Sequence, residues 1–244
     1  MKIQLSEHFT YHKLLRFVFP SIVMMIFTSI YGVVDGLFVS NYAGKTAFAA
    51  INLIMPFIMA LSALGFMVGT GGSAIVAKTL GEGREKEANR YFSMLIYLTI
   101  FGGIILSILG ILLARPVSIA LGASGDLLDY CTLYGRITFL SLTPFMLQNV
   151  FQCFFVTAEK PKLGLLVVVL AGVTNMVLDY LFIAVFGMGL VGAAIATVCS
   201  GLGVCVRSVT FIAIFSFHLP FSIKLFTISD IRIYYNIIIQ SFQW

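Results

Sequence analysis

Two aspartates, Asp35 and Asp179, lie inside long apolar stretches of the sequence. A carboxylate near the centre of a transmembrane helix costs ~2.5 to 3.5 kcal/mol on insertion scales, so each one is a candidate functional residue. Asp35 also lies near the C-terminal end of its stretch, where the helix dipole disfavours a negative charge unless a cation or proton compensates it. The chemistry predicted for these residues is the binding of a cation or a proton. The alternative for Asp35 is that it reaches the headgroup region of the bilayer.

Other oxygen ligands share the level of these aspartates. Asn175 precedes Asp179 by one helical turn, and Ala193 and Thr197 on the next apolar stretch are also one turn apart. Counting ~1.5 Å per residue from the outer ends places Asp35 about 6 Å deep, Asp179 about 10 Å and Thr197 about 9 Å. Carboxylate, amide, carbonyl and hydroxyl oxygens suit Na⁺ or H⁺ better than a transition metal. Unrelated polar residues that share a depth are the alternative.

The stretches that carry these residues are long enough to span a bilayer. Hydrophobic residues make up 60% of the 244 residues and charged residues only 10%, and the mean hydropathy is +1.04. A soluble domain carries about a quarter charged residues, and ~20 apolar residues cross the hydrocarbon core. The sequence therefore predicts an all-α polytopic membrane protein with six transmembrane helices, at residues 17–39, 47–77, 91–114, 133–157, 163–186 and 191–215.

The charges between the spans predict the topology. The net charge of +5 comes from basic residues spread along the chain, which does not favour nucleic-acid binding. Basic residues crowd alternate connectors, and this pattern places the N-terminus in the cytoplasm. They are Lys78, Arg84, Lys86 and Arg90 in the second connector, and Lys160 and Lys162 in the fourth. We expect a cytoplasmic N-terminal segment at 1–16, a six-helix lobe at 17–217, and a cytoplasmic connector with the truncated start of a further helix at 218–244.

Prolines, glycines and further polar residues also fall within the spans. Pro20, Pro56 and Pro144 can each kink a helix, as a hinge or as a static bend, and Gly65 and Gly69 allow close helix contact. A second set of polar residues either lines an aqueous cavity or hydrogen-bonds between helices: Tyr31, Asn52, Gln148, Asn149 and Gln152. No arrangement of Ser, His and Asp or of Cys and His supports catalysis, so the sequence does not predict an enzyme, and it predicts no cofactor or transition-metal site.

Several motifs in order resemble the multidrug and toxic compound extrusion (MATE) family of secondary transporters. Pro20 is followed by Asp35 within VVDGLFV, and the glycine-rich stretch 65–83 ends in AKTLGEG. The connector TAEKP at 157–161 follows, and NMVLD at 175–179 precedes GAAIAT at 192–197. The likeness runs over nearly all of residues 11–217.

The resemblance implies a transporter of twelve helices in two lobes, which exports cationic, amphipathic drugs across the cell membrane in exchange for Na⁺ or H⁺ by alternating access. In one branch of the family it implies a cation site made by Asp35, Asn175, Asp179, the Ala193 carbonyl and Thr197. It also implies a bend of the first helix at Pro20, coupled to that site. The likeness covers only the first lobe, so we expect the missing C-terminal lobe as a partner, besides lipid and cationic drugs. Alternatives are a non-transporting remnant or assembly subunit, or a flippase for a lipid-linked precursor.

Overall fold

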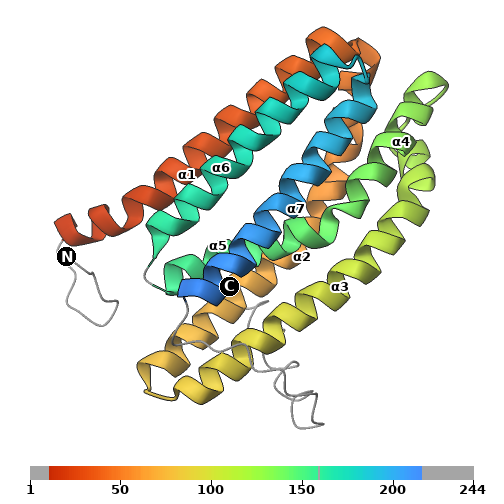
Figure 1. The fold of residues 1–244 in the computed structure, drawn as a ribbon. Coiled ribbons are helices and arrows are strands. Elements are labelled where there is room, and N and C mark those ends of the chain that lie inside the picture. Colours follow the sequence, from red (N-terminus) through yellow and green to blue (C-terminus); the bar gives the residue numbers. More distant parts are fainter. Residues whose placement is uncertain (1–10, 159, 216–244) are drawn as a thin grey trace.

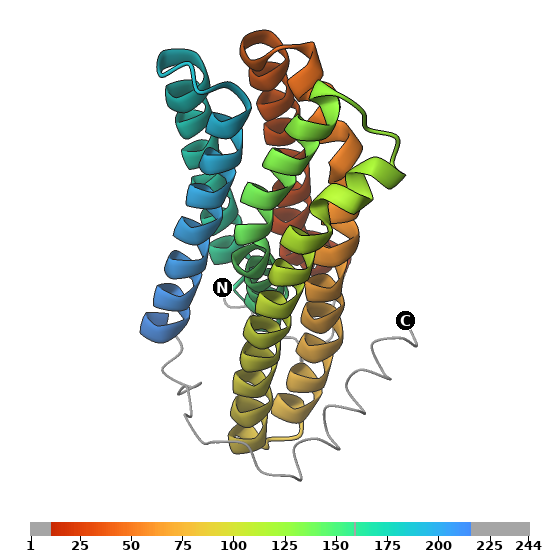
Figure 2. The same ribbon diagram turned by 90° about the vertical axis from the view of Figure 1, so that its right-hand side faces the viewer.

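The computed structural model describes residues 11–158 and 160–215, which form a bundle of long helices (Figures 1 and 2). The predicted segment 218–244 lies outside the described residues. The elements are α1 (Tyr11–Phe38), η1 (Val39–Ala43), α2 (Lys45–Gly81), α3 (Glu85–Ala120), α4 (Asp126–Leu140), α5 (Leu142–Thr157), α6 (Pro161–Asp179), η2 (Tyr180–Val185) and α7 (Gly189–Phe215). The two η elements are π-helical turns that continue α1 and α6. α1 begins at Tyr11, within the segment 1–16 that was expected to precede the first span.

The predicted six-helix architecture agrees with the described elements when α4 and α5 are counted as one bent span. Four helices are long and apolar enough to cross a membrane, namely α1 with η1, α2, α3, and α6 with η2. α4 and α5 together form a fifth span with a bend of 52°. α7 is the sixth helix, and its apolar part among the residues described with their side chains, Gly189–Gly203, is shorter than the other spans. The all-α fold is confirmed.

Pro144 accounts for the bend between α4 and α5. A proline ring collides with the carbonyl of the residue four positions earlier, which here is Leu140, the last residue of α4. Ser141 fills the break, and its hydroxyl donates a hydrogen bond of 2.8 Å to the carbonyl of Thr138. Pro20 and Pro56, by contrast, lie inside continuous helices. Of the three predicted kink positions, only Pro144 thus coincides with a break in the helix.

Glycines bring α2 against α5 and α3. A methyl group added at Gly65 would lie 2.7 Å from Cβ of Met146, and one at Gly69 would lie 3.0 Å from Cα of Val150. A methyl group at Gly72 would lie 2.5 Å from Leu95 on α3. The close contact predicted for Gly65 and Gly69 is therefore confirmed. These approaches make α2, α3 and α5 a tightly packed core, and α1 lies at its side along α6 (Figure 1).

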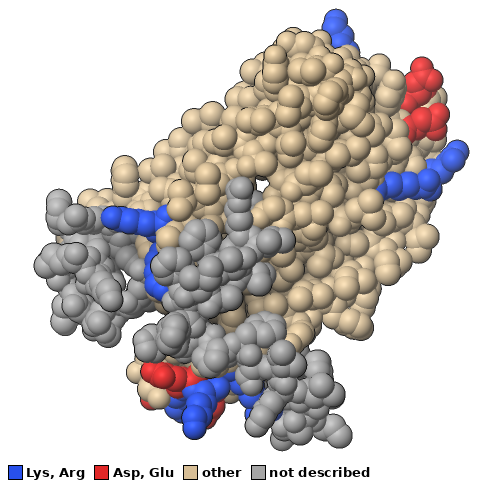
Figure 3. All heavy atoms as spheres, viewed as in Figure 1, with Lys and Arg blue, Asp and Glu red and all other residues tan. Residues whose placement is uncertain are grey.

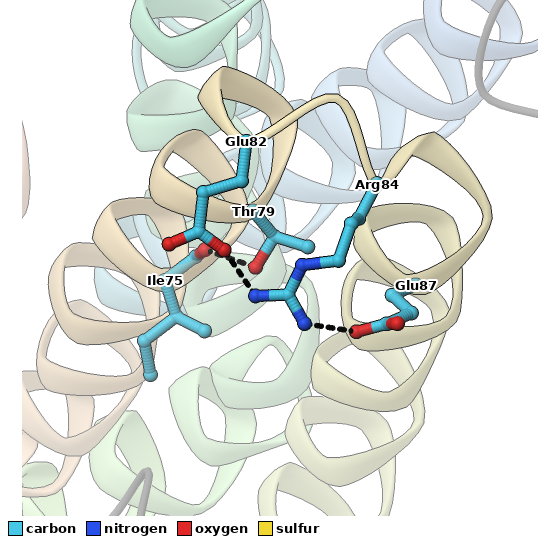
Figure 4. A network of polar contacts seen from close by, with 5 residues as sticks. All are labelled: Ile75, Thr79, Glu82, Arg84 and Glu87. Carbon is cyan, nitrogen blue, oxygen red and sulfur yellow. Dashed lines mark hydrogen bonds and ion pairs between the residues drawn. The ribbon is translucent and has the colours of Figure 1, made fainter.

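Charged side chains gather toward the two ends of the long helices, with uncharged surface between them on the face shown in Figure 3. The turn between α2 and α3 is one of these charged ends. Arg84 contacts the carboxylates of Glu82 and Glu87 (Figure 4). The hydrogen bond from Arg84 lowers the pKa of the exposed Glu82 carboxyl. This distribution of charge fits a bundle whose middle lies in hydrocarbon.

Candidate cation site

The two aspartates are brought together by the packing of α1 on α6. A methyl group added at Gly172 of α6 would lie 2.5 Å from the ring of Phe27 and 3.5 Å from that of Tyr31, both on α1. The missing side chain at Gly172 therefore lets the two helices approach closely. The helices run in the same direction, since Phe38 at the end of α1 packs edge to face on Tyr180 after the end of α6, with ring centroids 6.4 Å apart.

Helical spacing places both carboxyl groups on the faces of α1 and α6 that contact each other. Asp35 follows Tyr31 by one turn, and Asp179 follows Gly172 by two turns. Asp179 has no exposed surface, and Asp35 is half-buried. Each carboxyl group acts electrostatically on the other at short range. The sequence reasoning that placed them at similar depths thus selected two residues that are neighbours in space.

Both aspartates have buried carboxyl oxygens that accept no hydrogen bond from the described residues around them. Both Oδ atoms of Asp179 and Oδ1 of Asp35 are buried without a hydrogen-bond partner of acceptable geometry in the described part of the chain. Two carboxylates held close together inside a protein repel each other more strongly than in water, because the interior screens charge less. A buried carboxylate without partners also loses its hydration. The arrangement is therefore unfavourable until a positive charge is added, as a proton or as a bound cation.

Each aspartate comes just before a π-helical turn. Asp35 precedes η1 by four residues, and Asp179 is the last residue of α6, so that η2 begins directly after it. The two turns contact each other, and both also contact the start of α7. Val39 and Ile183, each four residues after an aspartate, belong to one buried cluster together with Ala193 of α7. π-Helical turns are rare and occur frequently at functional sites, and here they mark the level of the acidic pair.

The predicted ligands on α6 and α7 lie in or beside this buried region. Asn175 is buried one turn before Asp179, and Ala193 is 2% exposed. The Thr197 hydroxyl donates a hydrogen bond of 3.0 Å to the Ala193 carbonyl. The two α7 oxygens are therefore adjacent, and each keeps a lone pair that could face a cation. That these residues bind a cation stays a prediction.

The residues predicted to line a cavity are placed differently from one another. Tyr31 is half-buried and lies within electrostatic reach of both aspartates, so it belongs to the acidic site. Asn52 is exposed, and its amide donates to the Phe48 carbonyl of its own helix at 2.8 Å. Gln148, Asn149 and Gln152 are half-buried along α5. Pro20 is buried on α1.

Sequence reasoning missed Tyr134 of α4. Its side chain is 2% exposed and lies within electrostatic reach of Asp35, Asp179 and Tyr31. Its side chain interacts with that of Thr138 one turn further along α4, so Tyr134 places a buried hydroxyl near the acidic pair. The available signal was its place at the outer end of the fourth predicted span, the level at which the aspartates were found.

Comparisons with known proteins agree with this architecture. Residues 20–181 match the profile of the MatE family. The chain belongs to the MatE family. Multidrug export protein MepA of Staphylococcus saprophyticus is 27% identical to this MatE chain over 206 residues, which are 83% of the chain and 44% of the relative. MepA of Staphylococcus aureus strain MRSA252 is 26% identical over 193 residues, which are 78% of the chain and 42% of the relative.

Solved structures share the fold. A crystal structure described as MATE in the bent conformation superposes on this chain with a TM-score of 0.84 at 24% identity. The superposition covers 93% of this chain and 51% of the chain in that crystal structure. Another, described as MATE in the straight conformation, gives a TM-score of 0.84 at 22% identity, with coverages of 93% and 52%. The chain thus spans about half the length of the relatives that it matches. These relatives are named as export proteins and transporters, the class expected from the sequence, and not as enzymes.

Proposed function

We propose that this chain is the cation-binding lobe of an exporter that couples the exit of cationic, amphipathic compounds to the entry of Na⁺ or H⁺. One observation carries the proposal: two carboxyl groups, Asp35 and Asp179, lie together inside a membrane bundle, and buried oxygens of both have no hydrogen-bond partner among the described residues. Acidic residues in a membrane interior are expensive and mark ion or proton pathways. The names of the MepA relatives support drugs as the exported class.

The mechanism that fits this site is alternating access. Binding of a cation between Asp35 and Asp179 removes their repulsion and favours the arrangement in which α1 and α6 hold the carboxyl groups together. Loss of the cation favours an arrangement in which α1 moves away, with Pro20 as the position where one backbone hydrogen bond is already missing. A ligand shifts a protein between two states only if it binds one of them more tightly. Here the cation would bind more tightly to the state in which α1 holds Asp35 beside Asp179.

The drug would bind beside the lobe in a cavity that a second lobe completes. Half-buried polar side chains on α5, those of Gln148, Asn149 and Gln152, are the proposed wall of this cavity. The lobe would lie in the cell membrane with its N-terminus in the cytoplasm, in accordance with the basic connectors. A lipid-linked substrate is less favoured because the spans offer almost no cationic side chains to hold a phosphate.

The test is cation-driven efflux by a protein that carries this lobe joined to a second lobe. We expect Asp179→Asn to abolish efflux of ethidium from proteoliposomes under a Na⁺ or H⁺ gradient while the protein is inserted normally. Asn keeps the shape of the side chain and removes its charge. Asp126→Asn is the matched control, because Asp126 is exposed in the first turn of α4. Efflux by the Asp179 variant at the wild-type rate would overturn the proposal.

A further inference from the structure

Among the described side chains, one hydrogen bond joins α1 to α5. Nε2 of Gln152 donates to Sδ of Met24, with the two atoms 3.4 Å apart. Met24 is 5% exposed, and on α1 the buried side chains among those described are Met24 and Pro20. The bond therefore lies at a level where α1 is in close contact with the rest of the lobe.

The two ends of this bond differ in how firmly they are held. α5 is fixed to α2, because Gly69 lets Cα of Val150 and Sγ of Cys153 approach to 3.0 and 3.2 Å of a Cβ position. α1 packs along α6, and its contacts with α5 are few. Many of its apolar side chains are exposed, including Phe19 at 63% and Met25 at 68%. A side chain on a closely packed helix thus contacts a helix whose main packing partner is α6 and not α5.

Met24 and Asp35 lie on the same face of α1. Eleven residues separate them, which is three helical turns plus about 20° and a distance of about 16 Å along the axis. Tyr31, which contacts α6 at Gly172, lies on this face between them. A rotation or tilt of α1 that separates Met24 from Gln152 would therefore also move Asp35 relative to Asp179.

We propose that Gln152 is a positioning residue for α1, which acts through Met24 to hold the helix in the orientation that brings Asp35 to Asp179. The consequence for the cation rests on the proposed function above, whereas the attachment of α1 does not. A thioether sulfur is a weak acceptor, so the bond can open and close without a large barrier. Gln152 is thus assigned a role between the α5 wall and the acidic site, in addition to any contact with a drug.

The first experiment measures amide hydrogen exchange of residues 22–30 in the 244-residue chain in detergent micelles. Gln152→Leu keeps the bulk of the side chain and removes the donor, and Met24→Leu removes the sulfur. We expect each variant to speed exchange in this segment about 2-fold to 3-fold, the low end of the range for loss of a hydrogen bond, because the sulfur is a weak acceptor. The double variant should be no faster than either single one, because both remove the same bond.

Gln148→Leu is the matched control. Gln148 lies one turn earlier on α5, is also half-buried, and makes no side-chain hydrogen bond to any described residue. It should leave exchange of residues 22–30 unchanged, and exchange of α3 should be the same in all variants, as a check of the fold. Unchanged exchange of residues 22–30 in Gln152→Leu, or additive effects in the double variant, would overturn the assignment.

A second readout separates this inference from the proposed function. The concentration of Na⁺ or H⁺ that gives half of the cation-dependent protection should rise several-fold in Gln152→Leu and not in Gln148→Leu. If α1 loosens and the half-protection concentration stays the same, the link from Gln152 to the acidic site is wrong. If α1 loosens and even the wild-type chain gives no cation-dependent protection, the proposed function fails while the attachment of α1 by Gln152 stands.

Discussion

Replacing Gly65 by alanine tests the packing that fixes α5 on α2. The added methyl carbon would lie 2.7 Å from Cβ, 2.8 Å from Cγ and 2.9 Å from Cα of Met146. A rotamer change moves Cγ only, so the contacts with Cα and Cβ require the two helices to separate. Overpacking of this kind costs about 1–3 kcal/mol in stability. Part of this cost is offset because alanine stabilises a helix interior by about 1 kcal/mol relative to glycine.

Gly102→Ala isolates the packing cost. Gly102 lies inside α3, and a methyl group there would meet nothing within 4 Å. This variant should gain helix propensity without a collision, so the difference in unfolding free energy between the two variants is about 1–3 kcal/mol. For a chain of this size, that corresponds to about 2–4 °C in unfolding temperature per kcal/mol. Thermal unfolding in detergent, followed by circular dichroism, measures it. Equal unfolding temperatures for the two variants would refute the packing argument.

Two further predictions concern topology and completeness. In a cysteine-free background, a cysteine at position 160 should react with a membrane-impermeant maleimide only after the membrane is opened, whereas one at position 45 should react in intact cells. The reason is that basic residues crowd the connector that contains Lys160, which places this connector in the cytoplasm. The reverse labelling pattern would invert the topology. Cells that express the 244-residue chain alone should gain no drug resistance, since one lobe leaves the cavity without its second wall; growth at raised drug concentrations would contradict this.

The sequence predicts the spans and singles out the two aspartates, for a physical reason. In a membrane the cost of a charge is high, so Asp35 and Asp179 stand out against an apolar background without any knowledge of packing. The one-turn spacing of Asn175 and Asp179 follows from helix geometry alone. Gly65 and Gly69 are likewise detectable, because a small residue every fourth position has a direct packing consequence.

What the sequence does not predict depends on contacts between helices. Nothing in the local pattern of α1 and α6 says that they are neighbours, and it is the missing side chain of Gly172 that allows it. Tyr134 was overlooked because a tyrosine near a span end is ordinary at a membrane interface, and only the tertiary structure buries it beside the carboxyl groups. The bond between Gln152 and Met24 joins residues too far apart in sequence for any local pattern to predict it.

The central claim is that Asp35 and Asp179 together hold one positive charge, and cation-dependent stability of this chain tests it most directly. The measurement is the unfolding temperature of the 244-residue chain, wild type and Asp179→Asn, in Na⁺ against choline at several pH values. A ligand at 100 times its dissociation constant stabilises the folded state by about 2.7 kcal/mol. The wild-type chain should be stabilised by Na⁺ or by lower pH, and Asp179→Asn should lose most of that response. An equal response in the two proteins would contradict the account.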